Sequence, residues 1–327
     1  MSLRRVAASI AAASLVIAAC GEARPASNIA STASSAATTS TENDTVERSA
    51  IEFVGADSVT STIDDPSRIV TLSGDLTEIV FALGLGDSVV ATDVTTVHPP
   101  EAIGLPIIGV GRFLTAEGVL SQNPSLVLGD TQTSPQTAID QIRSAGVPVV
   151  ITEAPTSFAA LYEKTRQIGA VLDVSDKGQR LAEQIEAEVA AALAPAAEPT
   201  DRPRVAFVYS RGPDVMLLFG SGMSTQPVIE AVGGTDAGAA SGVSGTVAVT
   251  PEALVAAAPD VIVTTQEGLD ALGGVDAFLL IPGVAETPAG RNQRILAYPE
   301  GDVLTFGPRI AESLGLFIDD MRTVLDS

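Results

Sequence analysis

Short apolar runs rich in β-branched residues alternate with segments of helical periodicity along most of this chain. In the first half the pattern predicts helices over 76–83 and 136–144, and in the second half a helix over 226–232. Alternation of this kind is typical of βαβ units, so we expect mainly parallel sheets. The predicted strands are 68–72, 89–92, 126–128, 147–151, 204–209 and 261–263.

Two segments of the chain match each other without a gap, 114–128 and 249–263. Each reads as a short helix, a proline and a buried strand. Upstream of each lies a predicted helix with one acidic residue before a glycine-rich turn, Glu78 in the first half and Glu230 in the second. An internal repeat of this length indicates two similar lobes rather than one extended sheet.

The longest helical pattern lies between the two halves, over 175–194. Its apolar residues recur every fourth position from Leu181 to Leu193, and Pro195 and Pro199 end it. The sequence therefore predicts an α/β fold of two lobes with mainly parallel sheets, joined by a single long backbone helix. Because one helix is a semi-rigid connection, we also expect little lobe motion. The predicted segments are an N-terminal lobe at 51–172, the linking helix at 173–196 and a C-terminal lobe at 197–327.

The first twenty residues have the pattern of a targeting segment. Two arginines precede a fourteen-residue apolar stretch, Val6–Ala19, which is shorter than the ~20 residues needed to cross a bilayer. The stretch ends at Cys20, the only cysteine, and this ending resembles the lipobox of bacterial lipoproteins. The resemblance implies cleavage, lipidation of Cys20 and attachment to the outer face of the cytoplasmic membrane through the lipid. An ordinary secretory signal with an incidental cysteine is the alternative.

Residues 21–50 are rich in Ser, Thr and Ala and carry almost no large apolar side chain. Such a segment cannot bury enough surface to offset its ordering entropy, so we expect a disordered tether.

The charge balance excludes several classes of function. Acidic residues outnumber basic ones 40 to 18, for a net charge of −22, so nucleic acid is not expected as a partner. One cysteine excludes an internal disulfide and a thiolate zinc site, and one histidine excludes a multi-histidine metal centre. The single histidine also argues against a manganese or zinc importer subunit.

Over roughly residues 66–326, the chain resembles the helix-linked (cluster A-II, class III) solute-binding proteins of ABC importers, most closely the haem-binding, HmuT-type members. The resemblance implies two Rossmann-like lobes that hold haem in the cleft between them and deliver it to the permease and ATPase subunits of an ABC importer. Binders of ferric siderophores and of corrinoids such as cobalamin share most of these segments, so both remain alternatives. The segments that carry the resemblance are Arg68–Leu72, Thr77–Val80, Leu83–Asp87, Leu105–Gly109, Leu114–Glu117, Pro251–Glu252 and Thr305–Arg309.

Two residues are candidate axial ligands of the haem iron. His98 follows a predicted strand and precedes two prolines, which hold it in a stiff loop at the carboxyl end of the N-lobe sheet, where open α/β sheets bind ligands. Tyr209 ends the strand 204–209, and Arg211 extends from the same side of the chain, where its positive charge favours a phenolate. The resemblance implies that the iron is ligated from both lobes by these residues. The alternatives are a lone packing or surface histidine and a tyrosine bonded to backbone.

A haem also needs an apolar slot and cations for its propionates. The run 216–219 with Met223 supplies apolar side chains, although an ordinary buried strand explains that run equally well. Arg112 and Arg309, with Arg211, are the candidate propionate partners. The chain has sixteen arginines and two lysines, so these arginines also reflect composition.

The resemblance further implies that Glu78 and Glu230 contact arginines of the permease, one acidic residue from each lobe. Both residues also suit ordinary exposed helix positions.

A secreted hydrolase is the alternative from another class of function. The chain lacks a Gly-x-Ser-x-Gly motif, and its single histidine has no evident acidic partner, so no enzymatic activity is expected.

Overall fold

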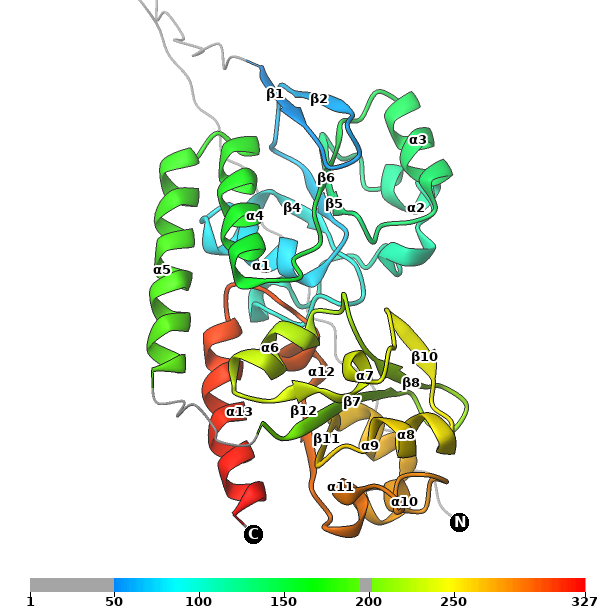
Figure 1. Ribbon diagram of the computed structural model, residues 1–327. Helices are drawn as coiled ribbons and strands as arrows, with labels where there is room; N and C mark the ends of the chain where they lie inside the picture. The colour runs from blue at the N-terminus through cyan, green and yellow to red at the C-terminus, as the bar shows by residue number, and fades with distance from the viewer. Residues whose placement is uncertain (1–49, 195–201, 327) are drawn as a thin grey trace, which may run out of the picture. The chain divides into compact units, whose positions relative to one another are not determined.

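The computed structural model describes residues 50–194 and 202–326 (Figure 1). The predicted signal peptide, the lipidation site Cys20 and the tether up to residue 49 lie outside the described residues. Within the described ranges, no helix has both the length and the apolar character needed to cross a membrane.

The first lobe is built on a four-stranded parallel sheet of order β4-β3-β5-β6 (Figure 1). One face is covered by α1 and α4 and the other by α2 and α3, so the strands are apolar on both sides. An antiparallel pair, β1-β2, precedes the sheet. The bounds are β1 Ile51–Val54, β2 Thr60–Ile63, β3 Ile69–Thr71, α1 Gly74–Ala82, β4 Val89–Ala91, α2 Ala116–Leu120, β5 Leu126–Asp130, α3 Gln136–Ser144, β6 Val149–Thr152 and α4 Phe158–Val171.

The second lobe contains a six-stranded mixed sheet of order β10-β8-β7-β11-β12, with β9 also paired to β7. The strands β7, β9, β11 and β12 are parallel, whereas β8 and β10 pair antiparallel at one edge. Helices α6 and α13 cover one face, and α7 to α11 cover the other. The bounds are β7 Arg204–Ser210, β8 Met216–Phe219, α6 Thr225–Ala231, β9 Thr235–Asp236, α7 Ala237–Ala240, β10 Thr246–Ala248, α8 Pro251–Ala257, β11 Val261–Thr265, α9 Gln266–Leu272, α10 Val275–Leu279, α11 Pro288–Arg291, β12 Ile295–Tyr298, α12 Glu300–Val303 and α13 Ile310–Leu325.

The predicted α/β fold is confirmed, and its repeat is visible in the elements. The helix predicted at 136–144 coincides with α3, and each half of the repeat forms a short helix followed by a central strand, α2 with β5 and α8 with β11. Both short helices begin with the same cap, since the Thr115 hydroxyl accepts from the amide of Gly118 and the Thr250 hydroxyl from that of Ala253.

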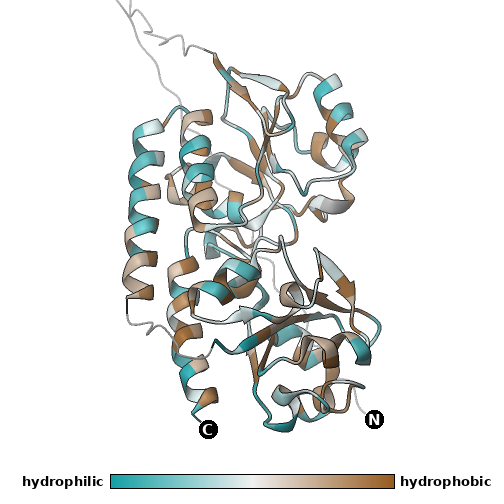
Figure 2. Ribbon diagram, viewed as in Figure 1, coloured by the Kyte–Doolittle hydropathy of each residue, from teal (hydrophilic) through white to brown (hydrophobic). Residues whose placement is uncertain are grey.

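The predicted long helix is α5, Ser175–Leu193, which runs beside α4 and reaches the start of α13 (Figure 1). Its buried stripe, which includes Ile185 and Val189, packs with side chains of α4 and α13, while its outer face is polar (Figure 2). Near its start, α5 meets α4 at two glycines, where a Cβ on Gly178 would lie 2.9 Å from the Cα of Gly169. The helix therefore contacts elements of both lobes. The lobe boundaries on either side of it stay a prediction.

Candidate functional site

A cleft of about 380 Å³ is lined by residues of both lobes. On the N-lobe side its lining comes from the segments that follow β3, β4, β5 and β6, which is the carboxyl edge of the parallel sheet. Open α/β sheets bind ligands at this edge because the loops there diverge. The C-lobe contributes Arg211, Phe219, Met223, Glu267, Glu300, Gly301, Leu304, Thr305 and Phe306.

The N-lobe wall of the cleft rests on a buried ion cluster. The Nζ of Lys164, in α4, lies 2.6 Å from Asp75 Oδ2 and 3.4 Å from Asp130 Oδ2, and Lys164 is only 2% exposed. Burial lowers the pKa of Lys164, but the two carboxylates outweigh it and leave the pKa above its ordinary value. The ammonium therefore stays charged, and the cluster holds two carboxylates against one cation.

Asp93 organises the loop that leads to His98. Its carboxylate accepts hydrogen bonds from the amide of Thr95 at 3.0 Å and from the Thr95 hydroxyl at 2.6 Å. Burial raises the pKa of Asp93 to about 6, and these hydrogen bonds, with one from the Gly111 amide, oppose the rise. The sequence reasoning missed Asp93, although an acidic residue two positions before a threonine is a recognisable turn signal.

His98 lies in a hollow beside the cleft. Its Nε2 is 3.9 Å from Asp302 Oδ1, its side chain is half-buried, and its peptide bond to Pro99 is cis. The hollow has a volume of about 500 Å³ and is also lined by Glu78, Phe81, Pro308 and Arg309 among others. His98 therefore lines a different space from Arg211 and Phe219. We call the space beside His98 the His98 hollow.

Tyr209 lies at the end of β7, where it joins Arg211 and Glu300. The Nε of Arg211 donates to the Tyr209 hydroxyl, and its Nη2 donates to Glu300 Oε1 at 2.9 Å. The Tyr209 hydroxyl is 3.5 Å from the same Glu300 oxygen, and its ring centroid is 6.1 Å from that of Phe219. The side-chain hydrogen bond with Tyr209 raises the pKa of Arg211 above its already high value. The predicted pairing of Tyr209 with Arg211 is thus present, and these hydrogen bonds of Tyr209 go to side chains rather than to backbone.

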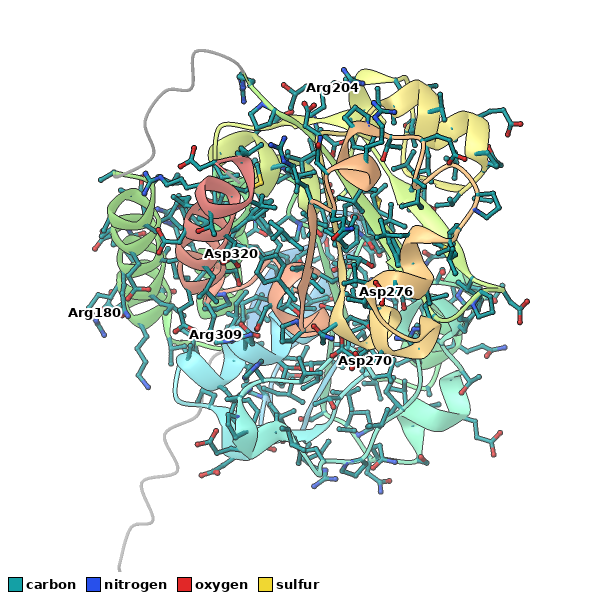
Figure 3. All side chains as sticks on the ribbon, turned by 90° about the horizontal axis from the view of Figure 1, so that it is seen from below. Arg180, Arg204, Asp270, Asp276, Arg309 and Asp320 are labelled. Carbon is teal, nitrogen blue, oxygen red and sulfur yellow. The ribbon has the colours of Figure 1, made fainter. Side chains whose placement is uncertain are left out.

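Arg309 and Glu78 form an ion pair between the lobes. Arg309 Nε lies 3.3 Å from Glu78 Oε1, and its guanidinium also lies 3.4 Å from Asp302 and 3.8 Å from Glu312. Figure 3 places Arg309 where α13, in red, meets the cyan part of the N-lobe. The expectation of an exposed Glu78 is wrong, because the first two turns of α1 are buried and Glu78 is only 5% exposed. Burial raises the pKa of Glu78 to about 7, against the opposing effect of Arg309.

The other predicted site residues lie in separate places. Glu230 is exposed on α6, where its carboxylate accepts from Gln226 at 2.8 Å. Arg112 belongs to the short 3-10 turn Gly111–Phe113, next to the cleft-lining Gly111. The apolar run 216–219 forms strand β8, and Phe219 and Met223 reach the cleft lining.

Helix α12 contacts both candidate iron ligands, and the sequence reasoning missed it. Glu300 contacts Tyr209 and Arg211, whereas Asp302 contacts His98 and Arg309. Between them, Gly301 packs on the loop before His98, where a Cβ would stand 2.0 Å from Val97 Cγ2. The signal in the sequence was the run Pro-Glu-Gly-Asp directly after a strand pattern.

The repeat also places two acidic residues at matching exposed positions. Glu117 lies in the first turn of α2 and Glu252 in the first turn of α8, and both are exposed. Among residues 50–194 and 202–326, no group of three or more His, Cys, Asp or Glu side chains is placed to hold a metal ion.

A family model described as periplasmic binding protein matches residues 69–301. Among curated proteins, the ABC transporter substrate-binding lipoprotein YvrC of Bacillus subtilis is 28% identical over 254 residues, covering 76% of this chain and 78% of the relative. A cobalamin-binding protein of Halobacterium salinarum is also 28% identical, covering 76% of this chain and 68% of the relative.

Solved structures give similar matches. The periplasmic haem-binding protein RhuT from Roseiflexus sp. RS-1, in its apo form, is 44% identical with a TM-score of 0.75, covering 79% of this chain and 98% of that one. The haem-binding protein HmuT is 34% identical with a TM-score of 0.79, covering 85% and 90%. Solved variants of HmuT replace a tyrosine, an arginine two positions after it, and a histidine by alanine. Tyr209 and Arg211 have the same spacing in this chain.

Proposed function

The chain belongs to the family of periplasmic binding proteins, and on that premise we propose that it binds haem in the cleft between its lobes and delivers it to the permease of an ABC importer. Its relatives and structural neighbours are substrate-binding proteins, so it is a binding protein and not an enzyme. The observation that carries the haem proposal is that Tyr209 lies against two residues that line the cleft, Arg211 and Phe219.

The lining of the cleft suits a flat apolar ligand. Val94 and Val97 line it from the N-lobe, and Phe219, Met223 and Leu304 line it from the C-lobe. Cofactor sites typically combine apolar walls with a few polar groups that fix orientation. The neighbours RhuT and HmuT, which are named as haem-binding proteins, support haem as the ligand.

Tyr209 is the first iron ligand in this proposal. A phenolate is a hard anionic ligand that suits ferric iron, and Arg211 donates to the oxygen of Tyr209 that would bind it. His98 is the second ligand. Because His98 lines its own hollow and lies near Asp302, its ligation requires the His98 loop or α12 to shift when haem enters.

Arg211 is the main propionate partner, since its side chain is 59% exposed at the cleft. Arg112 and Arg309 are the secondary partners. Arg309 already lies within ion-pair distance of three carboxylates, so a propionate has to compete for it.

A haemin titration tests the proposal. Wild-type protein should give a shifted Soret band with saturable binding, and Tyr209→Phe should weaken binding at least about tenfold, because an iron–ligand bond is lost. His98→Ala should change the spectrum of the bound haem. Tyr298→Phe is the matched control, since the Tyr298 hydroxyl donates to the exposed Asp320 of α13 and Tyr298 does not line the cleft. Absence of haemin binding to the wild type, or an unchanged affinity in Tyr209→Phe, contradicts the proposal.

A corrinoid is the second candidate ligand, favoured by the cobalamin-binding relative. A corrinoid brings its own axial groups, so its binding should not depend on Tyr209. Saturable binding of cobalamin that survives Tyr209→Phe, with no haemin binding, selects this function instead.

Docking to the permease is proposed to use one acidic residue from each lobe. Glu230 is accessible, whereas Glu78 is buried against Arg309, so a permease can reach Glu78 only if that ion pair opens. Glu117 and Glu252 are exposed at matching positions of the repeat and form the better matched pair. Stimulation of the reconstituted importer's ATPase should fall in the double variant Glu117→Ala, Glu252→Ala. If stimulation of the ATPase falls only in the double variant Glu78→Gln, Glu230→Ala, docking is assigned to Glu78 and Glu230.

Attachment to the outer face of the membrane is proposed to occur through a lipid on Cys20. The name of the relative YvrC, a lipoprotein, supports this reading. The protein should partition with membranes in its natural host, and Cys20→Ala should release it.

A further inference from the structure

The two acidic residues of α12 contact two of the three arginines proposed as propionate partners, Arg211 and Arg309. Glu300 holds Arg211 with oxygens at 2.9 and 3.3 Å, and Asp302 lies 3.4 Å from Arg309. A propionate is itself a carboxylate, so it seeks the same guanidinium donors in the same geometry. Each arginine is therefore engaged by a carboxylate of the protein's own chain.

Of the cleft-lining side chains that the structure describes, Arg211 is the only basic one. The opposite wall presents Asp75, Asp93 and Asp130. Lys164 lies behind that wall and is already held by two of these carboxylates. An anionic group entering the cleft is therefore attracted at Arg211 and repelled from the N-lobe wall.

We propose that Glu300 is an internal competitor for the propionates of the cargo, a carboxylate that Arg211 releases when an anionic ligand binds and takes back when the ligand leaves. This inference rests on the proposed function and adds to it residues that set affinity. Asp302 has the same relation to Arg309.

The position of α12 makes such an exchange possible without unfolding. Glu300 is the first residue of a four-residue helix, and its side chain is 26% exposed, so it can turn toward solvent. Its backbone stays fixed, because its amide donates to Glu267 at 2.9 Å. The competitor thus lowers affinity for an anionic cargo and favours its release at the permease.

Comparison of haemin with haemin dimethyl ester isolates the propionates. The two ligands share the iron and the apolar ring, but the ester carries no carboxylate. Glu300→Gln keeps the shape of the side chain and removes its charge. We expect Glu300→Gln to bind haemin about two- to fivefold more tightly than wild type, since partly exposed ion pairs are worth at most about 1 kcal/mol. Binding of the ester should not change.

Asp302→Asn serves as a second variant, with a smaller increase expected because Arg309 keeps its contact with Glu78. Asp276→Asn is the control for net charge, since Asp276 lies exposed on α10, outside the cleft lining (Figure 3). It should leave both affinities unchanged. Thermal melting of each variant checks that its fold is intact.

An unchanged or weaker haemin affinity in Glu300→Gln overturns the inference, because Glu300 then only positions Arg211. Equal tightening of haemin and its ester also overturns it, because the effect then acts at the iron or the ring. In both cases haem binding by the wild type still stands. If wild-type protein binds neither ligand, the proposed function and this inference fail together.

Discussion

The two walls of the cleft face the same space but are stabilised in opposite ways. The N-lobe wall carries three buried carboxylates, and two of them, Asp75 and Asp130, are held by one buried cation, Lys164. The C-lobe wall carries Phe219 and an ion pair, Arg211 with Glu300, that is open to solvent. Of the charged residues on the two walls, only Asp130 and Glu267 lie at or just after the end of the strand of the repeated helix-and-strand unit, and the others follow other strands. The comparison indicates that burial decides which of the charged side chains at the cleft can move.

The largest expected difference between the walls lies in stability. Lys164→Met leaves two carboxylates buried without their cation, which should lower the free energy of unfolding by about 3–5 kcal/mol. Arg211→Met breaks an exposed pair and should cost about 1 kcal/mol or less. Urea unfolding of the two variants measures both values. Similar losses in the two variants contradict the distinction between a fixed and an adjustable wall.

The free energy of unfolding should depend on pH, because Glu78 is buried at the contact between the lobes. The pKa of Glu78 is about 7 in the folded protein and 4.5 ordinarily, so the folded state holds its proton more tightly. Its stabilising contribution is full below pH 4.5 and is lost as the pH rises through 7. The decline amounts to at most about 3 kcal/mol. Glu78→Gln should remove it in unfolding experiments at pH 5 and 7.5, and an identical decline in the variant counts against the assignment. Because the pKa of Asp93 is also raised, to about 6, Asp93 causes a similar loss of stability as the pH rises toward 6. That loss should remain in the Glu78→Gln variant.

The close contact of α5 with α4 should tolerate no added volume. Gly178→Ala places a Cβ 2.9 Å from Gly169 and 3.2 Å from the Thr165 carbonyl oxygen, so it should cost about 1–3 kcal/mol. Gly315→Ala, in α13, is the matched control because a Cβ there meets no atom within 4 Å. It should stabilise the protein by up to about 1 kcal/mol through helix propensity. Melting temperatures that move in the same direction for both variants disprove the role of the contact.

The repeated unit itself should respond equally in both lobes. Thr115→Ala and Thr250→Ala each remove one helix cap in an exposed position, so each should cost about 1 kcal/mol. Chemical denaturation of both variants provides the test. A marked inequality between them indicates that the two halves of the repeat are no longer equivalent in energy.

Much of the fold follows from local patterns. The strand predictions fall on β3, β4, β5, β6, β7 and β11, and the long apolar stripe from Leu181 to Leu193 falls on α5. These predictions hold because apolar residues recur about every two positions on the buried face of a strand and every three to four on that of a helix, whatever the element packs against. The antiparallel edge formed by β8 and β10 was missed, since pairing direction depends on contacts between distant segments.

The candidate site was only partly predictable. Tyr209 and Arg211 are two positions apart at the end of one strand, and they were expected to lie on the same side. Their side chains are hydrogen-bonded, because alternate residues of an extended chain share a side. Glu78 was expected to be exposed because its neighbours in the sequence give no sign of the lobe that covers it. Glu300 was not singled out, because its partner Arg211 lies 89 positions away in the sequence.

The sequence by itself determined the duplicated α/β architecture, the linking helix and the position of Tyr209 near the end of its strand. The tertiary structure alone decided that Lys164 stands between Asp75 and Asp130, that Glu78 meets Arg309 across 231 positions, and that α12 contacts both candidate ligands. The reason is physical. Periodicity records which face of an element is buried, whereas the partner of a buried charge is fixed only when the elements pack and water is removed from around it.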